Sequence, residues 1–482
     1  MIALGYILSI TYGALCVLAG VLCHKAGIDK KYTRKLVHIL IGGEWFVLFH
    51  TVGVGLNLFF ICLLFTLALA AEYKIGFLPA MSSSDDNAPG TVYYGLAMST
   101  LSLLTVFVPD LIYPFGVAVL CTSLGDGIGG LVGGAIKRGN VVLHGKKTLF
   151  GTLVLTTVSF IGVYLFSLGY GYEITLLSIL EISLFAASVE LISKKGTDNL
   201  TLPLSTAALT YLLVAFPILA DYAFALTVLP LALTVICEKK VLTPTAAVGA
   251  ALLALVSSAA FKNVGALLLL IYFCLAVTTD KIKNLSEKSR QNKTFSHKSK
   301  TPRTLRQVVE NGVVAFIFAL LFVAYPSEIF AAGFVVSLAE SLADTAASGI
   351  GSLSELTCDI TRFKRCKAGL DGGVSLLGTI SALAFAALFS FIAYIFGILS
   401  LTAALLSCVL AFVGMLVDSV LGSRLQPKYK CTVCGELSSN AECCGTKGKI
   451  CSGFVRITNG TVNLLSSLFT SVLLCIILLA IS

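Results

Sequence analysis

Long apolar runs recur along almost the whole chain, and this feature constrains the fold more than any other. The 482 residues are 57% hydrophobic and only 12% charged. A water-soluble domain could not cover so much apolar surface with so few charges, and a disordered chain would have the opposite composition. A membrane-spanning helix needs about 20 apolar residues, so the chain has room for many of them. The sequence therefore predicts an all-α, polytopic integral membrane protein.

We expect about 16 spanning helices, and the first is predicted as a span because no basic stretch precedes it as in a cleaved signal. The predicted spans are 2–22, 37–52, 55–71, 92–108, 111–136, 149–168, 173–192, 204–219, 221–236, 244–261, 263–279, 308–325, 327–350, 374–397, 400–421 and 462–481.

Lysines and arginines concentrate in alternate loops and leave a net charge of +9. By the positive-inside rule these loops face the cytosol and both termini lie outside. The positive charge is thus assigned to loops, and no nucleic-acid partner is expected.

One pattern of polar and small residues occurs twice in the same order. Its pieces are Arg34, Asp126, Gly133, Thr148–Thr152 and Asn199 in the first half, and Arg306, Asp344, Gly351, Ser375–Thr379 and Asn463 in the second. Close helix packing explains the small residues, but a carboxylate inside a span is costly and indicates a functional site. Matching pieces enter the membrane from the same side. We therefore predict two parallel-related halves, 1–220 and 221–482.

The first half combines a carboxylate with basic residues near the predicted cytosolic face. Asp126 lies in a glycine-rich stretch, and lysines precede a predicted helix start, which is a favourable site for phosphate. A carboxylate facing phosphate suits Mg²⁺. The predicted catalytic residues are Asp126 (also as a magnesium ligand), His38, Glu190 and Asp198, and the predicted phosphate-binding residues are Arg34, Lys35, Lys146, Lys147, Thr148, Thr152 and Asn199. These residue types suit phosphoryl transfer to an alcohol.

Simpler roles remain open for some of these residues. Lys146 and Lys147 also fit exposed cytosolic lysines that only obey the positive-inside rule. As an exposed cytosolic residue, a phosphate-binding Lys147 would contribute little to folding, so Lys147→Ala should affect the nucleotide KM or kcat with little loss of stability. His38 also fits an interfacial histidine with satisfied hydrogen bonds. No glycine-rich loop of the Walker type is present, so the sequence excludes a P-loop kinase.

Several motifs of the first half, taken together, resemble one enzyme family. They are Arg34-Lys35-x-x-His38, Gly90-Thr91-Val-Tyr93-Tyr94, Gly125-Asp126-Gly127, the run Gly145–Thr152, and Glu190 with Asp198-Asn199-Leu-Thr-Leu-Pro203. This set resembles the CTP-dependent polyprenol kinases, which include dolichol kinase and phytol kinase and are related to phosphatidate cytidylyltransferases. The resemblance covers about 1–215. It implies transfer of the γ-phosphate of CTP to an isoprenoid alcohol.

The second half, about 228–482, resembles a different family, which contains plant phytyl-phosphate kinase. The matching pieces are 306–312, 339–345, 370–379, Asp418-Ser419 and 459–464. From this half we predict catalytic Asp344 and Glu340, magnesium ligands Asp344 and Asp418, and phosphate-binding Arg306, Asn311, Asp371, Ser375, Thr379 and Asn463. The sequence departs from the family at Gly349, where a glutamate is common. A second half without catalytic activity is therefore the alternative.

A cysteine-rich polar loop lies near 428–456, and its predicted cytosolic placement limits its chemistry. Cys431 and Cys434, followed by Cys443 and Cys444, resemble a zinc knuckle, which needs four ligands in tetrahedral geometry. The alternatives are free or redox-active thiols and a disulfide, and cytosolic placement argues against the disulfide.

The combined prediction is a bifunctional membrane lipid kinase. The first half would phosphorylate an isoprenoid alcohol with CTP, and the second would convert the monophosphate to the diphosphate. The predicted partners are the alcohol, its monophosphate, a nucleoside triphosphate and membrane lipids. The alternatives are a cytidylyltransferase that forms a CDP-lipid and a transporter built of parallel repeats.

Overall fold

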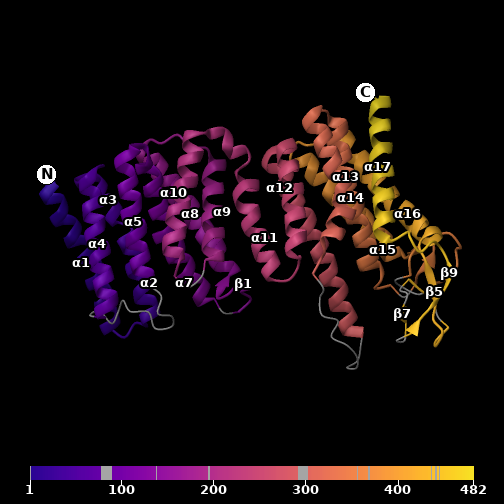
Figure 1. Cartoon of the computed structure of the whole chain (residues 1–482), viewed down its shortest axis with the longest axis horizontal. Helices are drawn as coiled ribbons and strands as arrows, with labels where there is room; N and C mark the ends of the chain where they lie inside the picture. The colour runs from indigo at the N-terminus through magenta and orange to yellow at the C-terminus, as the bar shows by residue number, and fades with distance from the viewer. Residues whose placement is uncertain are drawn as a thin grey trace. The chain divides into compact units, whose positions relative to one another are not determined.

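The computed structural model describes most of the chain. The described residues are 2–76, 89–136, 138–193, 196–290, 302–354, 356–366, 370–435, 437–439, 442–443 and 446–481, with backbone alone at 230, 283–290 and 442–443. They form two compact units, Met1–Val235 and Ile236–Ser482. Each unit is a set of helices with short strands at one end (Figure 1).

The first unit contains the helices α1 to α10 and most of α11. Their bounds are α1 Ile2–Lys25, α2 Lys30–Ile41, α3 Glu44–Thr51, α4 Leu56–Ile75, α5 Gly90–Phe107, α6 Ile112–Leu120, α7 Gly127–Ala135, α8 Leu149–Tyr170, α9 Leu176–Ile192, α10 Asp198–Ala215 and α11 Leu229–Glu238. A π-helical turn, Cys121–Asp126, joins α6 to α7. Strands β1 (Val142–His144) and β2 (Lys147–Thr148) form an antiparallel hairpin before α8.

The helix α14 is the centre of the second unit. The unit's helices are α12 Pro244–Arg290, α13 Leu305–Ala324, α14 Glu328–Gly351, α15 Leu376–Ile395, α16 Leu401–Leu425 and α17 Asn459–Ile481. Helix α14 packs against all five others. Many of its residues are alanine, glycine or serine, and these small residues let the neighbouring helices approach closely. The strands are β3 Cys358–Asp359, β4 Gly373–Val374, β5 Lys428–Lys430, β6 Leu437–Ser438, β7 Glu442–Cys443, β8 Thr446–Lys447 and β9 Lys449–Ser452.

The predicted all-α membrane architecture is confirmed, but the number of about 16 spans is not. Within the described residues, 11 helices are long and apolar enough to cross a membrane. The predicted span 37–52 is divided between α2 and α3 at Gly42 and Gly43, and α9 has only 17 residues. The predicted spans 244–261 and 263–279 both lie in α12, where non-helical torsions at Phe261 and Lys262 produce a kink.

The predicted sequence repeat has a counterpart in local geometry. A short antiparallel hairpin precedes α8 in the first unit and α15 in the second. The hydroxyls of Thr148 and Ser375 cap these helices by accepting the N–H of the residue three positions later. A Cβ at Gly133 would lie 3.0 Å from the Cα of Gly151, and a Cβ at Gly351 would lie 2.9 Å from the Cα of Gly378. Both units therefore contain the same close contact between consecutive helices.

Candidate active site

Glycines on two sides of α7 let the neighbouring helices approach the site. On one side, a Cβ at Gly130 would lie 2.8 Å from Cε and Nζ of Lys35, and a Cβ at Gly134 would lie 2.7 Å from Nζ of Lys31. On the other side, Gly129 and Gly133 face the start of α8, where backbone atoms lie equally close. The glycine-rich stretch after Asp126 is thus explained by space for two lysines of α2 and for the backbone of α8.

Asp126 ends the π-helical turn and contacts two basic residues of α2. The Nζ of Lys35 donates to Oδ2 of Asp126 at 2.8 Å and to its carbonyl at 3.3 Å. His38 Nε2 lies 2.9 Å from the carbonyl oxygen of Thr122 and 3.5 Å from Oδ2 of Asp126. A carbonyl oxygen only accepts, so Nε2 carries a proton, and in the neutral ring Nδ1 is the acceptor. Such π-turns are frequent at functional sites.

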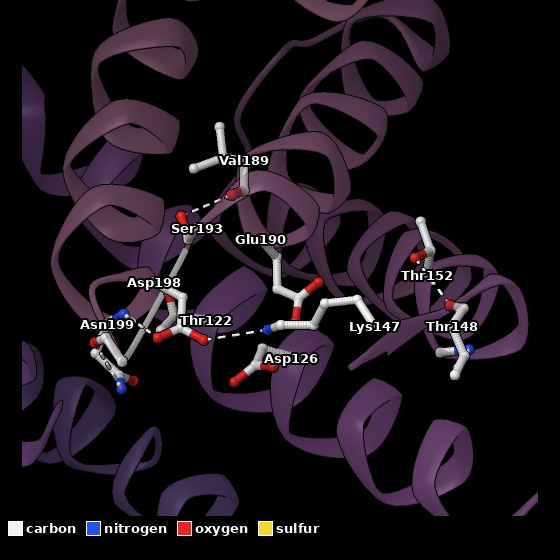
Figure 2. A network of polar contacts seen from close by, with 12 residues as sticks. Thr122, Asp126, Lys147, Thr148, Thr152, Val189, Glu190, Ser193, Asp198 and Asn199 are labelled. Atoms are coloured by element: carbon white, nitrogen blue, oxygen red, sulfur yellow. Dashed lines mark hydrogen bonds and ion pairs between the residues drawn. The ribbon is translucent and has the colours of Figure 1, made fainter. Parts of the chain in front are cut away.

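Lys147 of β2 links two further carboxylates from the ends of α9 and α10. Its ammonium group donates to Glu190 and lies 3.3 Å from Oδ2 of Asp198 (Figure 2). Burial alone would lower the pKa of Lys147, but the charges of Glu190, Asp198 and Asp126 raise that pKa above its ordinary value. The prediction that Lys147 is exposed is wrong, because its side chain is partly buried and pairs with two largely buried carboxylates. The reason for expecting little effect on folding is therefore removed.

Asp126, Glu190 and Asp198 form one carboxylate cluster. One oxygen from each residue lies within 4.8 Å of the others, which is a suitable arrangement for a shared cation. Carboxylate oxygens are the ligands that Mg²⁺ prefers, so the residues present fit a magnesium ion. Lys147 already supplies one positive charge at this cluster, and Figure 2 shows its side chain passing between Glu190 and Asp126 and pointing toward Asp198.

A large cavity connects this charged cluster to the apolar interior of the first unit. Its volume is about 1390 Å³. The charged and polar residues on its wall include Lys31, Arg34, Lys35, His38, Asp126, Lys146, Lys147, Asp198 and Asn199. The apolar wall comes from α1, α3, α4 and α5 and includes Val17, Leu48, Leu58 and Phe65. The cavity therefore has the shape and polarity that suit an amphiphile with one polar end.

The two predicted threonines have structural contacts in this arrangement. Thr148 caps α8 through the N–H of Gly151, and the hydroxyl of Thr152 donates to the carbonyl of Thr148 at 3.1 Å (Figure 2). Neither threonine is among the residues that line the cavity, whereas Arg34, Lys146 and Asn199 are.

The second unit brings its predicted carboxylates together around Ser466 of α17. The hydroxyl of Ser466 lies 2.8 Å from Oε1 of Glu340 and 3.3 Å from Oδ2 of Asp418. Asp344 and Asp371 interact electrostatically with Asp418. Burial raises the pKa of Asp371, and a hydrogen bond from Ser439 and the charge of Lys428 offset part of this effect. No described Lys or Arg forms an ion pair with Glu340, Asp344 or Asp418, which distinguishes this cluster from the first.

The other predicted residues of the second unit lie around the ends of α13, α15 and α17. Asn463 and Asn311 form a side-chain hydrogen bond of 3.1 Å. Arg306 pairs with Glu310 at 2.7 Å and donates to Thr458. Ser375 caps α15, and Thr379 donates to its carbonyl at 2.9 Å.

Gly349 is buried against α12. A Cβ at this position would lie 2.7 Å from Cγ2 of Thr279. A glutamate here would therefore require the Thr279 side chain or α12 to move, so glycine at this position fits the local packing.

Two polar features were not predicted from the sequence. Glu44 is a buried carboxylate at the start of α3 that lines the cavity. In the second unit, Lys428 and Asp359 form a buried ion pair of 3.4 Å between segments far apart in the sequence. Burial raises the pKa of Asp359, but hydrogen bonds from Thr361 and Ser423 and the charge of Lys428 hold this pKa below its ordinary value. The available sequence signals were a lone carboxylate in an apolar run and the Asp-x-Thr turn motif.

The cysteine loop is only partly described. Cys431 is buried and Cys434 is exposed. Only the backbone of Cys443 is described, and Cys444 lies outside the described residues. The zinc site stays a prediction.

These features define a class: a polytopic, helical integral membrane protein with two buried polar clusters near helix ends. Comparison with family models gives the family. Residues 227–471 match the integral membrane protein family DUF92, and the chain belongs to this family. No solved structure matches the chain significantly.

Three relatives show what the chain is similar to. Phytol kinase of Synechocystis sp. is 28% identical over 216 residues, which are 42% of this chain and 89% of that protein. An uncharacterized membrane protein of the same organism is 30% identical over 219 residues, 45% of this chain and 83% of the relative. Protein VTE6, chloroplastic, of Arabidopsis thaliana is 27% identical over 175 residues, 35% of this chain and 52% of that protein.

Proposed function

We propose that the first unit is a kinase that phosphorylates an isoprenoid alcohol. The observation that carries this proposal is the cavity, which joins a cluster of lysines and carboxylates to a long apolar wall. A lipid alcohol would place its chain along the apolar wall and its hydroxyl near Asp126. The similarity to phytol kinase supports the same substrate class.

The charged end of the cavity contains groups suited to each part of the transfer. The alcohol oxygen would attack the terminal phosphorus of a nucleoside triphosphate, and the bond from that phosphorus to the bridging oxygen would break. The nucleoside diphosphate leaves with that electron pair, and the hydroxyl proton passes to Nδ1 of His38. Lys35, Lys146 and Arg34 would neutralise phosphate oxygens. A magnesium ion held by Asp126, Glu190 and Asp198 would add positive charge at the same oxygens.

We propose CTP as the donor, cytosolic nucleotide entry, and a second phosphorylation in the second unit. The resemblance to CTP-dependent polyprenol kinases and the alternating basic loops support the first two points. The second phosphorylation is supported by the cluster of Glu340, Asp344, Asp371 and Asp418, in which no described Lys or Arg forms an ion pair with Glu340, Asp344 or Asp418. Buried carboxylates of this kind are stabilised by bound divalent ions, which in turn bind phosphate groups.

Product analysis with the purified full chain tests this proposal. The protein is incubated with labelled CTP, ATP or GTP and a panel of prenols, and lipid monophosphates are separated from diphosphates. Release of CDP with formation of a prenyl phosphate supports the kinase. Release of pyrophosphate would instead identify a cytidylyltransferase, because only the attacked phosphorus differs. Absence of any phosphorylated lipid with all nucleotides would contradict the proposal.

A further inference from the structure

One carboxylate that lines the cavity takes part in none of the described ion pairs of the charged cluster. Glu44 begins α3, is only 8% exposed, and lines the same cavity as Asp126. Its Oε1 accepts a hydrogen bond from Ser9 of α1. Its buried Oε2 has no hydrogen-bond partner among the described residues. An ionisable side chain at this depth is costly, so an unpaired oxygen beside a cavity indicates a ligand group.

Glu44 lies deeper in the cavity than the predicted reaction centre. It follows His38 by six residues, and Gly42 and Gly43 between the two helices keep right-handed helical torsions. At 1.5 Å per residue, the two side chains are separated by roughly 9 Å along the helix direction. Both line the cavity, and Leu48 and Leu58 contribute apolar wall on the Glu44 side. This position is therefore reached by the lipid part of a bound amphiphile.

The chemistry of Glu44 selects a hydroxyl as its partner. When Glu44 is ionised, Oε2 needs a hydrogen-bond donor, and when Oε2 is protonated, it needs a hydrogen-bond acceptor. A hydroxyl group can serve as either. A hydrocarbon chain supplies neither, and a phosphate group would be repelled by an ionised carboxylate. The lysines that would attract phosphate lie at the other end of the cavity. The lysines thus lie at one end of the cavity, and the carboxyl group of Glu44 lies deeper on the same wall.

We propose that Glu44 forms a hydroxyl-binding subsite, where an alcohol arriving from the bilayer places its hydroxyl before reaching Asp126. The identity of the ligand as a lipid alcohol rests on the function proposed above. The subsite admits the neutral substrate into the apolar part of the cavity. It excludes the phosphorylated product from the same place, so phosphorylation makes return to the deeper position unfavourable.

Equilibrium binding without nucleotide tests the subsite. A labelled C20 prenol is displaced from purified protein by unlabelled prenol or by a hydrocarbon with the same carbon skeleton. A hydrogen bond with a carboxyl group corresponds to about a tenfold preference for the alcohol. We expect this preference in the wild type, a smaller one in Glu44→Gln, and none in Glu44→Leu. Glu181→Leu is the matched control, because Glu181 is a buried carboxylate on α9 that does not line the cavity.

The outcomes separate the subsite from the kinase. Equal affinity for alcohol and hydrocarbon in the wild type would overturn the proposal and leave Glu44 with at most a bound water. A preference that survives in both Glu44→Leu and Glu44→Gln would overturn it as well, with thermal unfolding used to show that the variants are folded. A wild type that prefers the alcohol but transfers no phosphate would retain the subsite and remove the kinase.

Discussion

Replacing Gly130 with alanine should disturb the candidate active site without disturbing the fold. The new Cβ would lie 2.8 Å from Cε and Nζ of Lys35, which are the far end of a flexible side chain. The side chain of Lys35 can move, whereas a backbone could not, so α7 keeps its place. The ammonium group must then leave Oδ2 of Asp126, from which it lies 2.8 Å.

The expected effects on stability and activity differ in size. Exchange of glycine for alanine in a helix interior stabilises by up to about 1 kcal/mol, which offsets part of the lost contact. A hydrogen bond to a charged group contributes about 1.5–3 kcal/mol. If the transition state requires this contact, kcat/KM should fall by roughly tenfold to a hundredfold. The melting temperature should stay near that of the wild type.

Two other glycines provide matched controls. Gly162→Ala on α8 meets no atom within 4 Å, so it should change neither activity nor packing. Gly133→Ala would place Cβ 3.0 Å from the Cα of Gly151, so the backbone must shift and the melting temperature should fall. Prenol phosphorylation and thermal unfolding are measured for all three variants. Full activity in Gly130→Ala, or a loss of stability equal to that of Gly133→Ala, would refute the role assigned to Lys35.

Three further predictions address the clusters separately. Asp344→Asn should let the lipid monophosphate accumulate, whereas Asp126→Asn should block the alcohol but still convert added monophosphate; chromatography that shows diphosphate in Asp344→Asn would contradict this. The raised pKa of Lys147 should stabilise the fold below about pH 10.4 and lose this effect as pH rises through the folded value, so Lys147→Met should melt lower at pH 8 and lack the alkaline transition. The lowered pKa of Asp359 has the opposite sign: its stabilisation is complete above about pH 4 and is lost in acid, so Asp359→Asn should flatten the unfolding profile there, and an unchanged profile would contradict the ion pair with Lys428.

The sequence identified most residues of the first cluster but not how they contact one another. Carboxylates and lysines stand out in an apolar chain because each is costly in the membrane. The structure brings together Lys35 of α2, Asp126 of the π-helical turn, Lys147 of β2 and Glu190 near the end of α9. Spacing alone could not show that Lys147 bridges two carboxylates. That contact depends on the hairpin before α8, which short-range patterns do not specify.

Other features were outside the reach of sequence patterns for physical reasons. Helix breaks at Gly42 and Phe261 depend on tertiary packing, so the number of spans was not predictable from apolar runs. Lys428 and Asp359 are 69 residues apart and meet only after the loops fold. Glu44 was hidden because a single carboxylate hardly changes the hydropathy of a window.

The difference in charge between the two clusters would make the product mixture depend on magnesium supply. Lys35 and Lys147 pair with carboxylates of the first cluster, whereas no described Lys or Arg forms an ion pair with Glu340, Asp344 or Asp418 around Ser466. If both units act as proposed, lowering the free magnesium concentration should stop the second phosphorylation before the first. The ratio of lipid monophosphate to diphosphate would then report the ionic state of the compartment that supplies the nucleotide.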